Sequence, residues 1–275
     1  MTQSLGRRRS SLLRSWDVGT ARPVARRAGL VIALAQLPLR PLLTLLTRPR
    51  WQGTEQLGID GPAIVCGNHL SALDPFSFGH LLQASGVAPR YLAKESLFRV
   101  PVLGALLRAA RQIPVRRGTS RSADALVDAR AALARGEIVM IFPEGTYTRD
   151  RHLWPMRGRL GAARLALGTG APLLPIASWG GRALWPVGSP LPRPGRGRRV
   201  EALVGAPFTV SVRPGETEHE AAVRVTEELM ARLAALLGQL RGEEPPAVLH
   251  DGRTDTHRPE VGRPQPGYRA WKQET

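Results

Sequence analysis

Cysteine is nearly absent from this chain of 275 residues, in which Cys66 is the only one. A single thiol excludes a framework of disulfide bonds. With neither a Cys-x-x-Cys pair nor a cluster of Cys and His, a metal site is not expected. We therefore expect a protein of a reducing compartment. The length still suffices for a hydrophobic core, with about 70% of the unfolded surface buried on folding.

Aromatic residues make up only 5% of the chain, and lysine occurs only as Lys94 and Lys272 among 39 basic residues. No helix-turn-helix, zinc finger or RNA-stacking motif accompanies the formal charge of +17, which argues against a protein that binds nucleic acid. The preference for Arg, Ala, Gly and Pro suggests a GC-rich, bacterial genome. Against that bias, Lys94 is a candidate for a functional role.

The positive charge is concentrated at the N-terminus, where residues 1–50 hold ten Arg and one Asp. Residues 1–27 show no periodicity, and we expect them to be disordered. Residues 28–46 are apolar but interrupted by Gln36, Pro38, Arg40 and Pro41, and an Arg at the centre of a spanning helix would cost about 2.5–3.5 kcal/mol. We predict that residues 28–50 form short helices in the interface of an anionic membrane. A helical hairpin packed on the domain is the alternative.

Short apolar runs alternate with helical stretches from residue 62 onwards. This alternation predicts a single α/β domain over residues 51–240, with a mostly parallel central sheet flanked by helices. Its ligand sites are expected in the loops after Cys66, Val115 and Phe142, at the carboxyl ends of strands. Residues 241–275 are expected to form a disordered tail. The predicted strands are 62–66, 90–93, 111–115, 137–142, 172–178 and 199–205, and the predicted helices are 75–84, 102–110, 119–135, 158–167 and 216–240.

The loop after the first predicted strand reads GNHLSALDP over residues 67–75. In one continuous helix His69 and Asp74 would lie about 140° apart, but a loop that enters a helix at Pro75 can turn Asp74 back toward His69. The carboxylate would then fix the tautomer of the imidazole, whose other nitrogen takes a proton from a hydroxyl. An Asp before Pro is also an ordinary helix N-cap, so both interpretations stay open.

The loop after Phe142 reads PEGTYTRD over residues 143–150. Its Glu and Arg bracket a Gly-Thr pair, and such side chains can bind a polyol hydroxyl and a phosphate, the Arg through its planar fork of donors. A solvated loop is the alternative for this segment on its own.

Together these segments resemble the glycerolipid acyltransferase family, specifically the 1-acyl-sn-glycerol-3-phosphate acyltransferases. The resemblance covers about residues 50–210 and rests on four blocks in the family's order. The blocks are Asn68-His69 to Asp74, Lys94 with Ile113 to Arg116, Phe142-Pro143-Glu144-Gly145-Thr146, and Pro175 within Leu174 to Ile176.

The resemblance implies that His69 is the general base and that Asp74 orients it. The activated hydroxyl then attacks an acyl thioester directly, with acyl-CoA or an acyl carrier protein as donor substrate and no other cofactor. Glu144, Gly145 and Thr146 match the block that positions the glycerol of the acceptor. Candidates for its phosphate are Lys94, Arg116 and Arg149, with Arg157 a weaker one.

The implied reaction is acyl transfer to the 2-hydroxyl of lysophosphatidic acid, which gives phosphatidic acid at the cytoplasmic face of the membrane. The chain departs from the family at Tyr147, where many relatives carry an Arg, and Arg149 is close enough in sequence to supply the charge. The departure leaves another lysophospholipid or glycerol 3-phosphate open as the acceptor.

Two other mechanisms or roles compete with direct transfer. Cys66 and Ser71 flank His69, so an acyl-enzyme is conceivable, but nothing near Cys66 lowers a thiol pKa and no Gly-x-Ser-x-Gly elbow occurs. A catalytically silent lipid-binding relative is a further alternative, against which the intact His69 and Asp74 argue.

Overall fold

The computed structural model describes residues 34, 41–115, 124–193 and 197–252. A seven-stranded sheet in the order β1-β7-β6-β2-β5-β3-β4 forms its centre. The pairing of β6 with β7 is antiparallel and the other pairings are parallel. The strands are β1 (Thr47–Gln52), β2 (Ala63–Gly67), β3 (Arg90–Lys94), β4 (Ile113–Val115), β5 (Ile138–Ile141), β6 (Leu173–Trp179) and β7 (Arg198–Val204).

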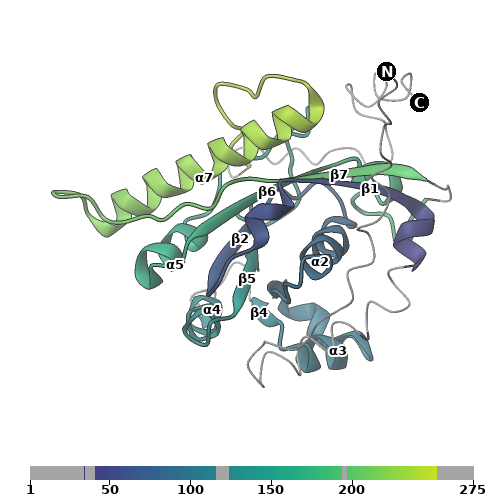
Figure 1. Cartoon of the computed structure of the whole chain (residues 1–275), viewed down its shortest axis with the longest axis horizontal. Helices are drawn as coiled ribbons and strands as arrows, with labels where there is room; N and C mark the ends of the chain where they lie inside the picture. The colour runs from purple at the N-terminus through teal and green to yellow at the C-terminus, as the bar shows by residue number, and fades with distance from the viewer. Residues whose placement is uncertain (1–33, 35–40, 116–123, 194–196, 253–275) are drawn as a thin grey trace, which may run out of the picture.

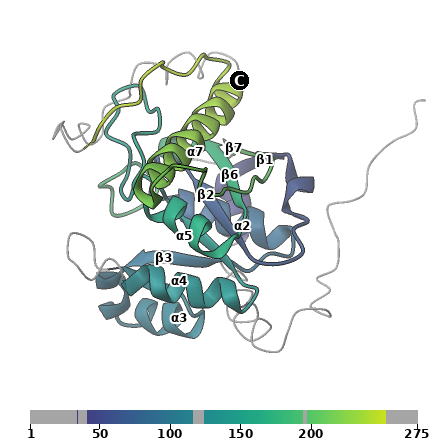
Figure 2. The ribbon, with the colours of Figure 1, turned by 90° about the vertical axis from the view of Figure 1, so that its left-hand side faces the viewer.

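Helices cover both faces of this sheet. One face carries α2 (Asp74–Ala84), and the other carries α4 (Asp124–Ala134), α5 (Gly161–Thr169) and α7 (Glu218–Arg241), which face the viewer in Figure 2. Shorter elements complete the fold: η1 (Thr54–Leu57), η2 (Glu95–Arg99), α3 (Leu103–Ala109) and α6 (Gly181–Leu184).

The central strands are apolar on both sides because both of their faces are covered. Along β2, Ile64 and Cys66 belong to the core under α4, α5 and α7, whereas Val65 belongs to the core under α2. In β5, Val139 and Met140 divide in the same way. The prediction of one α/β domain with a mostly parallel sheet flanked by helices is thus confirmed.

The N-terminal boundary of the domain differs from the prediction. Residues 47–50, placed by the sequence in the membrane-associated segment, belong to the edge strand β1, which pairs with β7. An edge strand needs no continuous apolar run and tolerates Pro49, so TRPRWQ carries little strand signal. Residues 41–46 are helical. In the part of the chain that the structure describes, no helix is both long and apolar enough to cross a membrane.

Residues 241–252 also differ from the expected tail, because they contact the domain. The carbonyl of His250 accepts from the backbone N–H of Arg157 at 2.9 Å, and Gly252 accepts from Arg149. The predicted disorder of residues 1–27 and the rest of the tail, and the candidate Arg116, lie outside the described residues.

Candidate active site

The loops after β2 and β5 lie side by side at the carboxyl edge of the sheet. The two strands pair in parallel, with Cys66 opposite Ile141, so the chain leaves both strands at the same edge. Asn68 fixes the first of these loops, because its amide donates to the carbonyl of Ser178 in β6 and accepts from the N–H of the same residue, at 3.0 and 2.8 Å. The two polar clusters of the sequence therefore meet.

Asp74 is turned back toward His69. Its Oδ2 lies 3.1 Å from Nδ1 of His69 and accepts from the backbone N–H groups of Leu70 and Ser71 at 2.6 and 2.7 Å. The hydroxyl of Ser71 donates to Oδ1 at 2.7 Å. The N-cap position of α2 belongs to Leu73, and no side chain caps it. The carboxylate of Asp74 thus binds both the imidazole of His69 and the backbone of the loop. Asp74 is therefore not simply the N-cap of α2.

His69 is held through both its ring and its backbone. Its ring stacks on Phe142 and packs against Tyr147, with both pairs of ring centroids 4.1 Å apart. Its carbonyl accepts from the N–H of Thr148 at 2.8 Å, and its side chain faces Asp74. Because a carboxylate only accepts, Nδ1 is the donor, which leaves Nε2 to take up a proton.

Glu144 joins the two loops through its carboxyl group. Its Oε1 accepts from the N–H of His69 and its Oε2 from the N–H of Met156, both at 3.0 Å. The residue is only 3% exposed. Burial raises the pKa of Glu144 to about 8, although the two backbone donors oppose this shift. One oxygen of Glu144 thus holds the backbone of His69, and the other holds the backbone of Met156.

The turn around Glu144 needs the glycine that follows it. Gly145 has a φ of 71°, and its N–H donates to the carbonyl of Phe142 at 2.9 Å. A Cβ at this position would come within 2.6 Å of Nε of Arg159. The sequence therefore requires Gly here both for its backbone conformation and for the close approach of an arginine.

Comparison with known proteins relates the sequence of this chain to a family. The family model described as Acyltransferase matches residues 48–179. The chloroplastic 1-acyl-sn-glycerol-3-phosphate acyltransferase of Brassica napus is 33% identical over 140 residues, which are 50% of this chain and 39% of that protein. The enzyme of the same name from Borreliella burgdorferi is 35% identical over 127 residues, 45% of this chain and 48% of that protein. Over residues 48–179 the chain is thus similar to this acyltransferase family.

A solved structure agrees with the fold. The 1-acyl-sn-glycerophosphate acyltransferase of Thermotoga maritima has a TM-score of 0.58 to this chain at 24% sequence identity, covering 78% of this chain and 82% of that one. The matched segments span less than half the length of the two curated relatives.

The cations predicted for the phosphate do not all converge in the structure. Lys94 is exposed at the carboxyl end of β3, next to β5 in the sheet. Arg149 donates from Nη1 to the carbonyl of Gly252 at 2.9 Å. Arg157 is half exposed and lies 3.6 Å from Asp251 and 3.9 Å from Glu227. Of the three candidates within the described residues, Lys94 is the one whose ammonium group has no hydrogen bond or ion pair there.

Two arginines near the site were missed by the sequence analysis. Arg159 is exposed, and its side chain lies against Gly145. Arg182 follows Gly181, a residue that packs against the hydroxyl of Ser71 and against Asp74. Its Nη1 is enclosed without a hydrogen-bond partner in the described structure, and burial lowers the pKa of its guanidinium. The only sequence signal for these two residues was the general excess of Arg, which does not single out a position.

Cys66 does not face the site. It is fully buried among the aliphatic side chains under α4, α5 and α7, and burial raises the pKa of its thiol. A neutral, enclosed thiol is a poor nucleophile. The interpretation of Cys66 as a small packing residue is therefore favoured over an acyl-enzyme.

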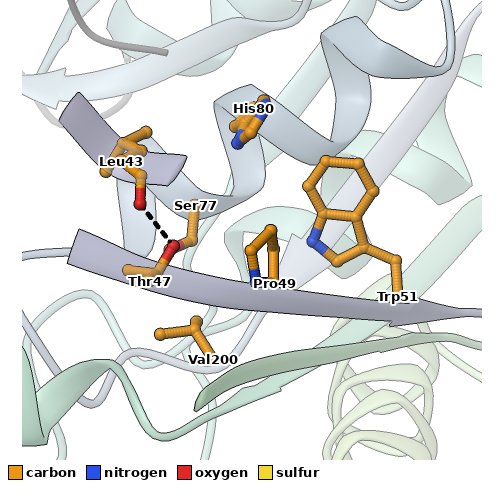
Figure 3. A pocket seen from close by; sticks show the side chains of 7 residues that line it. All are labelled: Leu43, Thr47, Pro49, Trp51, Ser77, His80 and Val200. Carbon is orange, nitrogen blue, oxygen red and sulfur yellow. Dashed lines mark hydrogen bonds between the residues drawn. The ribbon is translucent and has the colours of Figure 1, made fainter. Parts of the chain in front are cut away.

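A small pocket lies apart from His69 and Asp74, between β1, α2 and the helical turn before β1 (Figure 3). The empty space there, counted together with the solvent at its open mouth, is about 230 Å³. At the edge of the pocket, the hydroxyl of Thr47 donates to the carbonyl of Leu43 at 2.6 Å. The ring of Trp51 packs edge-on against the ring of His80. None of the predicted site residues lines it. Its lining residues are Leu43, Thr47, Pro49, Trp51, Ser77, His80 and Val200.

Proposed function

We propose that this protein transfers an acyl group from the thioester of acyl-CoA or an acyl carrier protein to the 2-hydroxyl of lysophosphatidic acid. The observation that carries the proposal is the contact of His69 with Asp74 beside the Glu-Gly-Thr loop, in a chain similar to the acyltransferase family. The curated relatives are named for this reaction.

The reaction follows from the orientation of the imidazole. Nε2 of His69 takes the proton of the acceptor hydroxyl as its oxygen bonds to the thioester carbon, and Asp74 stabilises the imidazolium through Nδ1–H. Collapse of the tetrahedral intermediate breaks the carbon–sulfur bond, and the proton passes from Nε2 to the leaving thiolate. His69 is thereby restored without a covalent acyl-enzyme.

Each remaining residue has a role set by its contacts. Glu144 and Ser71 are positioning residues, because one holds the backbone of His69 and the other holds Asp74. Lys94 is proposed to meet the phosphate of the acceptor, with Arg159 as a second cation beside Gly145. Gly145 and Thr146 are proposed to position the glycerol of the acceptor.

The reaction is proposed to take place at the cytoplasmic face of the membrane. Residues 28–46 and their flanking arginines would hold the enzyme in the interface of an anionic bilayer, from which the acceptor is drawn. Neither a metal nor a further cofactor is needed for the steps above.

The test is formation of phosphatidic acid by the purified full chain from acyl-CoA and lysophosphatidic acid. We expect turnover by the native protein and none by His69→Ala with its fold intact. Full activity of His69→Ala, or absence of product from the native chain with either donor, would refute the proposal. Offering other lysophospholipids and glycerol 3-phosphate to the same preparation decides the acceptor.

A further inference from the structure

The segment after β3 carries apolar side chains that the described structure leaves exposed. Together they form what we call the η2–α3 patch. In Figures 1 and 2, α3 lies at the lower periphery of the molecule. Within this seven-residue helix only Gly104 and no apolar side chain is buried. The patch consists of Leu97, Val100, Val102, Leu103 and Leu106.

The backbone of the patch is strained where it is most exposed. Val102 has φ 63° and ψ −59°, and the N–H of Leu103 donates to the carbonyl of Pro101 at 2.6 Å. This is a γ-turn of the rare, strained kind, and a β-branched residue at positive φ is an outlier. The Val102 side chain is 83% exposed. Within the described residues the Val102 side chain itself packs against little, so it is free to contact a partner outside the chain.

The patch is supported from behind, which keeps it in place. Gly104 packs so closely that a Cβ would lie 2.1 Å from the carbonyl oxygen of Phe98. The same oxygen accepts from Nη1 of Arg108 at 2.6 Å, and the N–H of Gly104 donates to Val100 at 2.7 Å. The turn and the helix thus form one preformed unit.

Charge indicates which partner fits this surface. Residues 94–111 contain four basic side chains and a single acidic one, Glu95. Glu95 lies 3.4 Å from Arg99, whose side chain is 76% exposed. Aliphatic side chains surrounded by basic ones are the composition that binds at the interface of an anionic bilayer.

The patch also lies at the edge of the sheet from which the catalytic loops project. The segment η2 follows the carboxyl end of β3, which is parallel to β5. The helical residues 41–46 reach the same edge at the other end of the sheet, since β1 runs antiparallel to β6. There Leu42 and Leu45 are exposed. Apolar surface thus flanks the catalytic loops on both sides.

We propose that the η2–α3 patch docks onto an anionic lipid bilayer, with Val102 inserted among the acyl chains. The inference rests on the proposed function only in taking a lipid as the partner. It adds a membrane contact within the folded domain to the one proposed for residues 28–46.

The experiment places a fluorescent probe on the patch of the full chain. Because Cys66 is buried, Val102→Cys offers one accessible thiol for a polarity-sensitive dye. Val127→Cys on α4 is the matched control, since Val127 is 67% exposed and lies outside the patch. With vesicles of phosphatidylcholine and phosphatidylglycerol in equal parts, we expect a blue shift of the dye at residue 102 and none at 127. Equal spectra at the two positions would overturn the proposal.

Binding provides a second measurement. Val102→Asp is expected to weaken partition into the same vesicles by about tenfold or more, and Val127→Asp to leave it unchanged. Equal effects of the two substitutions on partition would refute lipid docking. So would a blue shift of the dye at residue 102 that grows with protein concentration in the absence of vesicles, since it would point to a second copy of the chain as the partner.

Activity separates this inference from the proposed function. Val102→Asp is expected to lose turnover on lysophosphatidic acid in vesicles but keep it on a short-chain, monomeric acceptor. If the native protein binds vesicles as expected but acylates no acceptor, the proposed function fails and the docking surface stands. If both acceptors are acylated equally by Val102→Asp, the docking surface fails and the proposed function stands.

Discussion

Replacing Asp74 by Asn separates the charge of this residue from its geometry. The Asn amide oxygen can take the place of Oδ2, where it accepts from Nδ1 of His69 and from the N–H groups of Leu70 and Ser71. The amide nitrogen then replaces Oδ1, and the Ser71 hydroxyl can rotate from donor to acceptor. Every hydrogen bond is kept, so the free energy of unfolding should change by less than about 1 kcal/mol.

The catalytic effect of the same change should be large. A neutral amide cannot stabilise the imidazolium that forms as the hydroxyl loses its proton. General-base catalysis contributes about 10²–10⁴-fold to the rate, so kcat of Asp74→Asn is expected to fall by that factor, or about 3–5 kcal/mol in activation free energy.

Asp74→Ala provides the contrast. It leaves the buried N–H groups of Leu70 and Ser71 without an acceptor, at about 1–3 kcal/mol each, so this variant should lose stability as well as activity. The assay is steady-state kcat for acyl transfer, with urea unfolding of the same preparations. If folded Asp74→Asn kept more than a tenth of the native kcat, the charge of Asp74 would not be what activates His69.

Three further predictions concern the surroundings of the dyad. Cys66→Ala should keep most of kcat, since the buried thiol has a raised pKa; a hundredfold loss in a folded variant would favour an acyl-enzyme. Because the pKa of Glu144 rises from 4.5 to about 8 on folding, the folded chain binds the extra proton, and its stability should decrease as the pH rises from about 4.5 through 8, by at most about 1.4 kcal/mol per pH unit. Urea unfolding at several pH values should show this slope in the native chain and not in Glu144→Gln; an unchanged slope in the variant assigns it to another group. Tyr147→Ala should lower kcat by about two- to tenfold through loss of the ring contact with His69, whereas Tyr147→Phe keeps the ring and should lose less; equal kcat values for the two variants would contradict a positioning role.

The parts of the fold that the sequence predicted are those with a strong local signal. The run that became β5 is apolar throughout because both of its faces are covered, and α7 follows its helical spacing from the capping box at Thr217 and Glu220 to Gly242. β1 escaped prediction because an edge strand has no continuous apolar run, and its place is set by pairing with β7, some 150 residues away in the chain.

The same division holds at the site. The sequence by itself determined which residues stand at the carboxyl ends of β2 and β5, since strand boundaries and polar clusters are local features. Only the tertiary structure decided that Asp74 turns back to His69, that both oxygens of Glu144 hold backbone groups, and that Arg149 points to Gly252. Such contacts depend on which segments the sheet brings together, and a side chain of one type can satisfy many of them. Residue identity therefore limited the chemistry open to this protein, while packing between distant segments assigned each side chain its partner.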